Sequence, residues 1–493
     1  MSGRCYCYSL FILALIFVAP ELHITARGAE AGPAKGTCLA CLKIRVGIPL
    51  VEQGPAGNVA DNNFSEIQLP GGRYRGFTAA GETYAIDGKT PLDMSAPMRK
   101  VLGRGAPGSY DSCGQWIQHA ELSGATTIGW VHNETACNYA KGQTHMSTSI
   151  AMSSDYGLTW KDHGLILSNN DVPALNKSTG EGGYTFVDGK DGYYYGYCYR
   201  NRDGQEIVSR APVSDPEPGK WFKYFQGKWD QPGIGGDATG LAKGSGGNAA
   251  RWNTTGETLL LGWVKGGMGV RFSTDHLNFS TMPEPIMDLD TGSWNRPSPT
   301  ELLSYPVLLD AKAGGNQLSN SWMISYMYIQ PNESFDKRYL ILRTVDVSVE
   351  NAPLHPQVGI QLARWYNPTA HDHWSTTAPV PPLNGSPYKL EAKSGYLMTV
   401  ADPAKPSVEL EDCVSSWPGH PDHMLDRKGV CEADRLHFQR LRTAGWVYAE
   451  SQPGTTPLYR CYDAQERSHF ASNAADCEKL GATEKLLGYI LSN

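Results

Sequence analysis

The sequence predicts an all-β protein made of two different sets of internal repeats. Between about residue 45 and residue 350, short apolar and aromatic runs alternate with clusters of Gly, Pro, Asn and Asp, and helical periodicity is scarce. Aromatic strand motifs return at a regular interval within this region, and a second repeat fills the remainder of the chain. With 493 residues, 54 Gly and 32 Pro, the chain is turn-rich and long enough for two or three domains.

The first 31 residues have the pattern of a secretory signal peptide. Arg4 precedes an apolar run at residues 9–20, and the small-residue sequence Ala29-Glu30-Ala31 follows as a cleavage site. The run is too short to span a bilayer comfortably, so we expect cleavage and no membrane span afterwards. An uncleaved anchor is the alternative. We expect a secreted protein, extracellular or periplasmic, with a flexible segment at residues 32–44.

Cysteine usage agrees with an oxidising compartment. Cleavage near Ala31 leaves nine of the 11 cysteines, of which most should pair and at least one should remain free. Cys38 and Cys41 have redox or metal spacing, but no second pair completes a zinc site. A local disulfide or a flexible segment is therefore expected there. A disulfide between Cys113 and Cys137 is a further hypothesis.

Residues 45–350 carry an aromatic strand motif in five copies, at residues 76–79, 128–132, 196–199, 261–264 and 325–328. The spacing of roughly 50–70 residues is the size of a four-stranded propeller blade. The sequence therefore predicts a β-propeller at residues 45–350, with five blades and with six as the alternative.

A tight turn at residues 153–160, Ser-Ser-Asp-Tyr-Gly-Leu-Thr-Trp, repeats with the strands. Ser153 and Asp155 can bond the turn backbone, and Gly157 supplies a positive φ. Degenerate copies begin at Ser214 and Ser273. The pattern resembles the Asp-box of sialidases and related β-propeller proteins, which implies a hairpin between the third and fourth strands of a blade. It also implies a position far from the active site, so Asp155 is expected to be structural.

The second repeat fills residues 351–493, after a boundary marked by Pro353 and Pro356. Arg364 precedes His373 by nine positions, and Arg460 precedes His469 by the same nine. A degenerate middle copy and a trailing Gly-aromatic pair in each copy give three units of roughly 45–50 residues, each too small to bury a core alone.

These units predict a pseudo-threefold β-trefoil-like domain. The pattern Leu458-Tyr459-Arg460, His469-Phe470 and Gly488-Tyr489 resembles a domain of uncharacterised function that is appended to secreted bacterial and fungal proteins. The Asp-His pairs of the repeat are interpreted as turn hydrogen bonds that hold each unit together, with shallow binding sites as the alternative.

Carboxylates near the starts of the blades suggest carbohydrate chemistry. Glycoside cleavage needs one protonated and one ionised carboxyl group. The candidate catalytic residues are Asp111, Glu134, Glu181 and Asp237. Individually each of them also fits a turn or a strand end, but together they should point into one central funnel. The expected substrate-binding residues are Trp116, His132, Arg75 and Glu301.

The layout is similar to the five-bladed glycoside hydrolases, which include arabinofuranosidases, xylosidases and fructan-cleaving enzymes. The resemblance lies in architecture and placement rather than in a diagnostic motif. It implies that Asp111 is the base or nucleophile, that Glu134 or Glu181 is the general acid, and that Asp237 stabilises the transition state.

The net charge of the chain limits the classes of partner that it can be expected to bind. A net charge of −7 without long basic runs argues against nucleic acid, so the expected partner is an oligo- or polysaccharide, bound by a monomer without a cofactor. No ligand spacing indicates a metal. Two alternatives to a hydrolase remain: a non-catalytic secreted glycan-binding protein, and a sialidase. A sialidase needs three arginines on the substrate carboxylate, for which Arg251, Arg271 and Arg343 are available.

Overall fold

In the described part of the chain, four separate β-sheets and one 14-stranded sheet make up the fold of the computed structural model. The structure describes residues 36–94, 96–243, 248–264, 267–282, 284–287, 292–350, 357–415, 420–433 and 438–493. Almost all regular structure in these residues is β-strand, and the single described α-helix, α1 (Val430–Ala433), is short. The expected signal peptide, residues 32–35, and the expected boundary at Pro353 and Pro356 lie outside the described residues.

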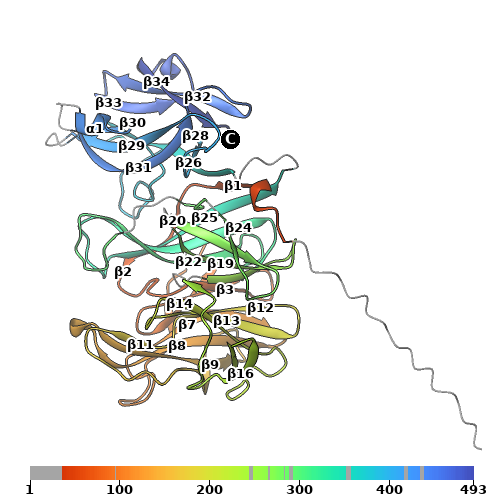
Figure 1. Ribbon diagram of the computed structural model, residues 1–493. Coiled ribbons are helices and arrows are strands. Elements are labelled where there is room, and N and C mark those ends of the chain that lie inside the picture. The colour runs from red at the N-terminus through yellow and green to blue at the C-terminus, as the bar shows by residue number, and fades with distance from the viewer. Residues whose placement is uncertain are drawn as a thin grey trace, which may run out of the picture. The chain divides into compact units, whose positions relative to one another are not determined.

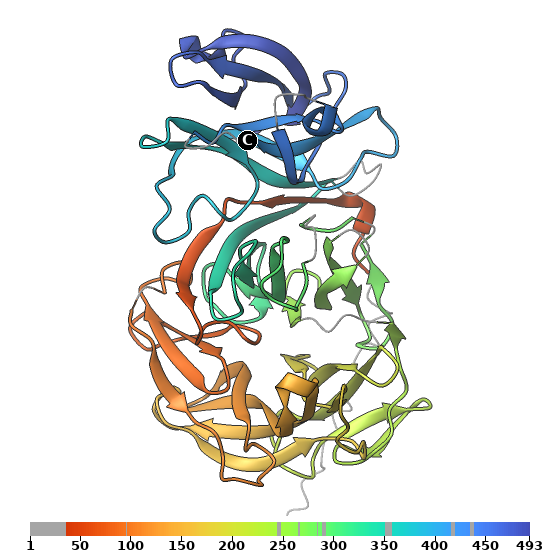
Figure 2. The same ribbon diagram turned by 90° about the vertical axis from the view of Figure 1, so that its left-hand side faces the viewer.

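The four separate sheets are blades of a β-propeller and follow one another around a common axis (Figure 2). The first consists of β3 (Ser65–Gln68), β4 (Tyr74–Ala79), β5 (Thr83–Gly88) and β6 (Arg99–Leu102). The second consists of β7 (Gly114–Ser123), β8 (Thr126–Asn138), β9 (Gln143–Ser153) and β10 (Lys161–Leu167), with β11 (Ser178–Gly180) parallel to β9.

The third and fourth blades repeat this antiparallel order. The third consists of β12 (Tyr184–Asp188), β13 (Tyr193–Arg200), β14 (Gln205–Pro212), β15 (Phe222–Phe225) and β16 (Lys228–Pro232), with β17 (Ala242–Lys243) on β14. The fourth consists of β18 (Asn248–Trp252), β19 (Glu257–Val264), β20 (Gly267–Ser273) and β21 (Ser280–Thr281), with β23 (Gln317–Leu318) parallel to β18.

The fifth aromatic motif lies in the 14-stranded sheet, not in a separate sheet of its own. β22 (Leu302–Asp310), β24 (Ser321–Ile329) and β25 (Arg338–Val349) start the 14-stranded sheet, and β2 (Leu50–Ala56) pairs with β25. β1 (Leu42–Val46) pairs antiparallel with β25 and parallel with β26 (Gln357–Asn367), which carries the sheet on into the C-terminal region (Figure 1). In each of the five places the aromatic motif forms the second strand of its group, β4, β8, β13, β19 or β24.

The strand β1 corrects the expected flexible segment at residues 32–44. Leu42, Ile44 and Val46 are buried in alternation with Lys43 and Arg45, as in a strand with one face in the core. Just before β1, a 3₁₀-helix, η1 (Leu39–Cys41), is closed by a disulfide between Cys38 and Cys41. Residues 42–44 are therefore part of a paired strand.

The inner strands pack beside one another in a closed order, β3, β7, β12, β18 and β22, with β22 returning to β3. Side chains cross-link them through backbone groups. The Ala120 N–H donates to Ser65 Oγ at 2.8 Å, and the Ala249 N–H donates to Thr185 Oγ1 at 2.6 Å. The Leu308 N–H donates to Asn248 Oδ1 at 3.0 Å.

Asn316 joins three blades at once. Its side-chain amide donates to the carbonyls of Phe186 at 2.7 Å and Ala249 at 3.1 Å, and it lies 3.4 Å from His119 Nδ1. The main-chain carbonyl of Asn316 accepts the backbone N–H of Arg251 at 2.8 Å. Because Asn316 is buried, these bonds are made in a medium where leaving them unmade is costly.

The turn at residues 153–160 connects β9 to β10, the third and fourth strands of their blade. Asp155 accepts the N–H groups of Leu158 and Thr159 at 3.0 and 2.9 Å and the hydroxyl of Ser153 at 2.7 Å. Burial would raise the pKa of Asp155, but these bonds lower it to about 2. Asp275 accepts the backbone N–H groups of its own turn in the same way. Asp155 therefore acts in the turn, as expected.

The C-terminal region repeats one three-stranded pattern three times. Its first unit is β26, β27 (Asp372–Thr376) and β28 (Lys389–Met398); the second is β29 (Ser407–Ser415), β30 (His423–Arg427) and β31 (Phe438–Tyr448); the third is β32 (Thr455–Asp463), β33 (Ser468–Ser472) and β34 (Ala482–Leu491). The third strands of the units pair with one another, β28 with β31, β31 with β34, and β34 with β28.

Glycine permits this close approach at equivalent positions. Gly395 and Gly445 have φ of 120° and 143°, and a Cβ on Gly395 would lie 2.3 Å from the carbonyl oxygen of Leu491 in the neighbouring unit. A Cβ on Gly445 would lie 2.9 Å from the Met398 carbonyl oxygen. The Gly-aromatic pairs of the sequence therefore mark the seams between units.

The sequence predicted that the Asp-His pairs would form hydrogen bonds within each unit. In the structure these hydrogen bonds join one unit to the next. His423 Nδ1 lies 2.7 Å from Asp372 Oδ2, and His469 Nδ1 lies 2.8 Å from Asp422 Oδ2. Ser468 stands where the third aspartate would be, and its hydroxyl accepts the His373 N–H at 2.7 Å. Each unit is thus tied to the next, which explains why the pattern recurs.

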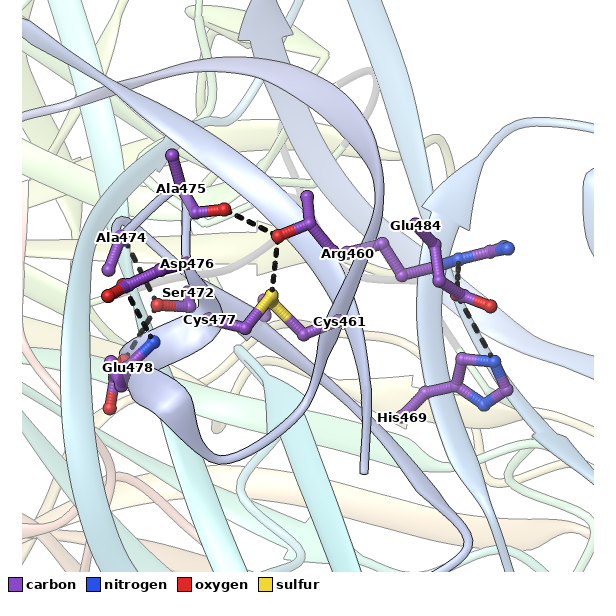
Figure 3. The surroundings of a disulfide bond; sticks show 12 residues. Arg460, Cys461, His469, Ser472, Ala474, Ala475, Asp476, Cys477, Glu478 and Glu484 are labelled. Carbon is purple, nitrogen blue, oxygen red and sulfur yellow. Dashed lines mark hydrogen bonds and ion pairs between the residues drawn. A yellow bond between two sulfur atoms is a disulfide. The ribbon is translucent and has the colours of Figure 1, made fainter. Parts of the chain in front are cut away.

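His469 generates a prediction about pH. Its Nε2 also lies 3.4 Å from Glu484 Oε2 (Figure 3). Burial alone would lower the pKa of His469, but Asp422 and Glu484 raise it to about 9. Since unfolded histidine titrates near ~6.5, the charged ring stabilises the fold fully below that pH, and the contribution is lost as pH rises through about 9.

We expect the free energy of unfolding from urea titrations to fall by about 3 kcal/mol over this window through His469. The variant His469→Gln should lose this part of the pH dependence, whereas His371→Gln, at a position with a 60% exposed side chain, should keep it. Identical pH dependence in wild type and His469→Gln would contradict the assignment.

Candidate functional site

One cavity of about 380 Å³ brings together side chains from several blades. Two carboxylic acids, Asp61 and Glu134, are among its lining residues. The cavity is lined by Asp61, Asn63, Trp116, Gln118, His132, Glu134, Tyr139, Thr144, Met146, Ser178, Gly183, Tyr199, Asn201 and Tyr305. A few polar groups among aromatic rings are the usual lining of a small-molecule site.

The loop before β3 holds Asp61 in place. Asn62 clamps it, since its side chain donates to the Ile117 carbonyl at 2.7 Å and accepts the Ala79 N–H at 3.0 Å. The Asp61 N–H donates to the Ala79 carbonyl at 2.7 Å. Ala60 has φ of 44°, a conformation that a residue with a Cβ rarely adopts and that the surrounding bonds enforce.

Asp61 has few partners for its negative charge. Tyr305 donates its hydroxyl to Asp61 at 3.4 Å, and Arg338 Nη1 lies 3.9 Å from the carboxylate. The Arg338 guanidinium also donates to the Val59 carbonyl at 2.9 Å. Burial raises the pKa of Asp61 to about 6, with Arg338 opposing the rise and the charge of Glu134 adding to it. Asp61 therefore keeps its proton to a higher pH than an ordinary aspartic acid does.

Glu134 lies in β8 in the opposite situation. His132 Nε2 lies 3.2 Å from its Oε1, and the Tyr139 hydroxyl donates to its Oε2. Burial would raise the pKa of Glu134, but the hydrogen bonds and charge of His132 and the bond from Tyr139 outweigh it, so the pKa is lowered. Glu134 is therefore ionised where Asp61 is not.

His132 is fixed from both sides. Its ring meets the edge of Trp116 at 5.1 Å between centroids, and a Cβ on Gly182 would lie only 2.7 Å from His132 Nδ1. A residue larger than glycine at position 182 would thus displace the ring. This packing points Nε2 at Glu134.

The predicted Cys113–Cys137 disulfide is present and ties the extended end of β8 to the start of β7. The Cys113 N–H donates to the Glu134 carbonyl at 2.9 Å. η2 (Tyr139–Lys141) follows directly, so the disulfide also limits the movement of Tyr139. Of the cysteines in the described residues, Cys198 is the free one and is buried.

Three of the eight predicted site residues, Glu134, Trp116 and His132, line the cavity. Asp111 does not line it: its carboxylate accepts the Ser109 hydroxyl and packs on Gly105, where a Cβ would lie 1.9 Å from Oδ1. It closes a turn, which was the alternative interpretation of this residue.

Glu181 and Asp237 also lie outside the cavity lining. Glu181 forms a closed ion pair with Lys223 at 2.6 Å, and the two side chains are 2% and 0% exposed. Lys223 further donates to the carbonyls of Ser168 and Gly236. Asp237 is 68% exposed, with Arg202 at 4.0 Å.

Arg75 and Glu301 connect parts of the fold. Arg75 pairs with Asp87 at 2.6 Å and donates to the Tyr156 carbonyl at 2.9 Å, in the turn at residues 153–160 of the next blade. Glu301 accepts the Tyr328 hydroxyl at 2.9 Å and pairs with Arg442 of β31 at 3.1 Å. Glu301 thus links the propeller to the C-terminal region.

Sequence reasoning missed Asp61 and left Tyr305 without a role. Asp61 lies in the polar stretch Asp61-Asn62-Asn63, which has the composition of an ordinary turn. The signal that was available is position: the stretch directly precedes the first strand of a blade, where the other candidates were sought.

The arginines available for a sialidase are engaged elsewhere. Arg343 donates to Tyr326, Gly47 and Thr377, and Arg271 pairs with Glu206 at 2.5 Å. Among the cavity's lining residues, all of them in the described part of the chain, none is an arginine. A threefold clamp on a substrate carboxylate is therefore missing from this site.

Two features are absent from the described ranges. No group of three or more His, Cys, Asp or Glu side chains there is arranged to hold a metal ion. No helix in those ranges is both long and apolar enough to cross a membrane.

No protein-family model matches the chain, and no curated protein matches its sequence significantly. Similar solved structures include an α-L-arabinofuranosidase from Lactobacillus brevis, 12% identical, with a TM-score of 0.40 over 60% of this chain and 92% of that one. Zg3597, a family 117 glycoside hydrolase from Zobellia galactanivorans, is 10% identical, with a TM-score of 0.41 over 63% and 92%. A xylan β-1,4-xylosidase from Bacillus halodurans C-125 is 10% identical, with a TM-score of 0.40 over 90% and 96%.

The clamp on the Asp61 loop generates a stability prediction. Asn62→Ala removes both bonds and leaves the Ile117 carbonyl and the Ala79 N–H unpaired in a buried place. We expect it to lower the free energy of unfolding by about 2–4 kcal/mol in urea titrations. Asn253→Ala, which removes an exposed amide that bonds Arg251, should change it by less than about 0.5 kcal/mol. Equal effects of the two variants would show that Asn62 is not a clamp.

Proposed function

We propose that the protein is a secreted glycoside hydrolase with Asp61 and Glu134 as its pair of catalytic carboxyl groups. One observation carries the proposal: the two acids line one cavity, and their surroundings move the pKa of Asp61 up and that of Glu134 down. Groups whose pKa values are pushed apart in one site are suited to act as acid and base. A protein that only binds a glycan, without cleaving it, would not need two carboxyl groups with separated pKa values.

In the proposed reaction, protonated Asp61 is the general acid. It donates its proton to the glycosidic oxygen as the bond to the anomeric carbon breaks, so that the leaving sugar departs as a neutral alcohol. Tyr305 and Arg338 hold the resulting carboxylate. The rise in pKa favours this role, because it keeps the proton on Asp61 at mildly acidic pH, where an ordinary aspartic acid has already lost it.

Ionised Glu134 serves the other face of the sugar. It either removes a proton from an attacking water, or attacks the anomeric carbon itself and forms a glycosyl ester. In the second case a water then cleaves the ester, and Asp61, now ionised, takes the proton of that water. In both cases the charge of Glu134 stabilises the positive charge that develops on the ring. His132 and Tyr139 keep it ionised and oriented. Trp116 offers a ring to the apolar face of a sugar.

The finer description of the fold belongs to the same proposal. We propose that β22, β24, β25 and β2 complete the propeller as a fifth blade, which the closed order of inner strands supports. The C-terminal region would be a β-trefoil-like domain, supported by its three equivalent units. Secretion is supported by the four disulfides found among the described residues.

The test is hydrolysis of a panel of aryl glycosides and oligosaccharides by the purified protein. We expect cleavage of at least one neutral substrate, and a fall in kcat of about 10²–10⁴-fold in Asp61→Asn and in Glu134→Gln. Asp215→Asn, which changes a carboxylate in the turn that follows β14, should keep wild-type activity.

Two outcomes would contradict the proposal. If no substrate of the panel is cleaved, the enzyme class is wrong and a glycan-binding protein becomes the better account. If Asp111→Asn loses activity while Asp61→Asn keeps it, the protein is still a glycoside hydrolase. Its catalytic carboxyl groups then include Asp111, as the sequence predicted, and not Asp61.

A further inference from the structure

An indole that is half exposed lies next to the wall of the cavity. Trp294 is 51% exposed, although tryptophan is among the side chains that gain most from burial. Its ring meets the edge of Tyr305 at 5.7 Å between centroids and lies 5.8 Å from Phe335. Tyr305 is itself a wall residue of the cavity.

Contacts lead from Trp294 to Asp61 by two routes. On one side Tyr305, which touches Trp294, donates its hydroxyl to Asp61 at 3.4 Å. On the other side Arg338 lies over the ring of Phe335 at 4.6 Å and 3.9 Å from Asp61. The exposed indole and the proposed general acid therefore belong to one packed cluster.

The segment that carries Trp294 is pinned. The guanidinium of Arg296, two residues on, donates to the carbonyls of Glu333 at 3.1 Å, Thr300 at 2.5 Å and Gln330. The Asn295 N–H donates to Ser293 Oγ at 3.1 Å. The indole is thus held in position before any ligand arrives, which lowers the entropy lost when a ligand binds.

We propose that Trp294 is the stacking platform of a second sugar subsite, which binds one pyranose ring of a neutral oligosaccharide. An exposed aromatic face matches the apolar face of one such ring, and its continuity with Tyr305 puts that ring beside the sugar held in the cavity. A protein partner would need a far larger apolar area than one indole. The proposal rests on the proposed function, because it takes the cavity as the place of the first sugar.

It follows that the substrate has at least two sugar units. It also follows that the contact with Trp294 helps to position the sugar that reacts beside Asp61. Contacts to parts of a substrate that do not react provide energy for positioning the reacting part. A single sugar, which cannot reach both places, should not sense Trp294.

The test measures binding rather than cleavage, by calorimetry on full-length Glu134→Gln protein. The probes are xylose, arabinose, galactose and glucose and their neutral oligosaccharides of two to six units. We expect Trp294→Ala to weaken binding of the oligosaccharides about tenfold and to leave binding of the monosaccharides unchanged. Trp294→Phe should keep most of the affinity. Phe222→Ala, which removes a 40% exposed ring from the third blade, should have no effect.

The proposal is overturned if Trp294→Ala binds every oligosaccharide as the parent does, if it weakens monosaccharides equally, or if no probe binds. Its failure is distinguishable from that of the proposed function. Binding that depends on Trp294 in a protein that cleaves nothing would refute the hydrolase alone. Cleavage of oligosaccharides by wild type and Trp294→Ala with equal kcat/KM would refute the subsite alone.

Discussion

The fold depends on side chains that bond across from one inner strand to the next. The inner strands of neighbouring blades do not form one continuous ladder, since each blade is a separate sheet. Asn316 supplies the central connection, with bonds to Phe186 and Ala249 of two blades and a contact to His119 of a third. Because these polar groups are buried, each bond fixes a single arrangement, whereas apolar packing alone would tolerate several. The positions of the cavity residues follow from that arrangement, and so does the closed order of the inner strands.

The chemistry of the cavity arises from a contrast between its two acids. Asp61 and Glu134 come from segments that are far apart in the chain, and the propeller fold places both in the wall of one cavity. Asp61 is half-buried, with one distant cation and a weakly bonded hydroxyl, whereas Glu134 receives bonds from His132 and Tyr139. The difference in pKa is thus a property of the surroundings of each carboxyl group. The surroundings also set the pKa of a structural residue in the turn at residues 153–160. There the hydrogen bonds that close the turn lower the pKa of Asp155 and keep it ionised.

Residues differ in how far sequence alone reveals their roles. The aromatic motif around Trp130 repeats because each second strand needs large side chains between blades, so the period of the propeller is visible in the chain. The role of Asp61 is not visible, because it depends on Asn62 bonding groups 17 and 55 residues away. The ion pair of Glu181 is not visible either, because its partner Lys223 lies 42 residues later in the sequence. β1 joins two regions through pairings with strands that are some 300 residues distant in the sequence, which no local pattern encodes.

The central claim is that Asp61 is protonated under conditions where Glu134 is ionised. Infrared difference spectroscopy of the wild type against Asp61→Asn tests it directly, because a carboxylic acid and a carboxylate absorb at different frequencies. The account predicts that the protonated carbonyl band lost in Asp61→Asn disappears from the wild type with a pKa of about 6, and that the band assigned through Glu134→Gln disappears at lower pH than that of an ordinary glutamate. Loss of the Asp61 band at the same low pH as the Glu134 band would contradict the account.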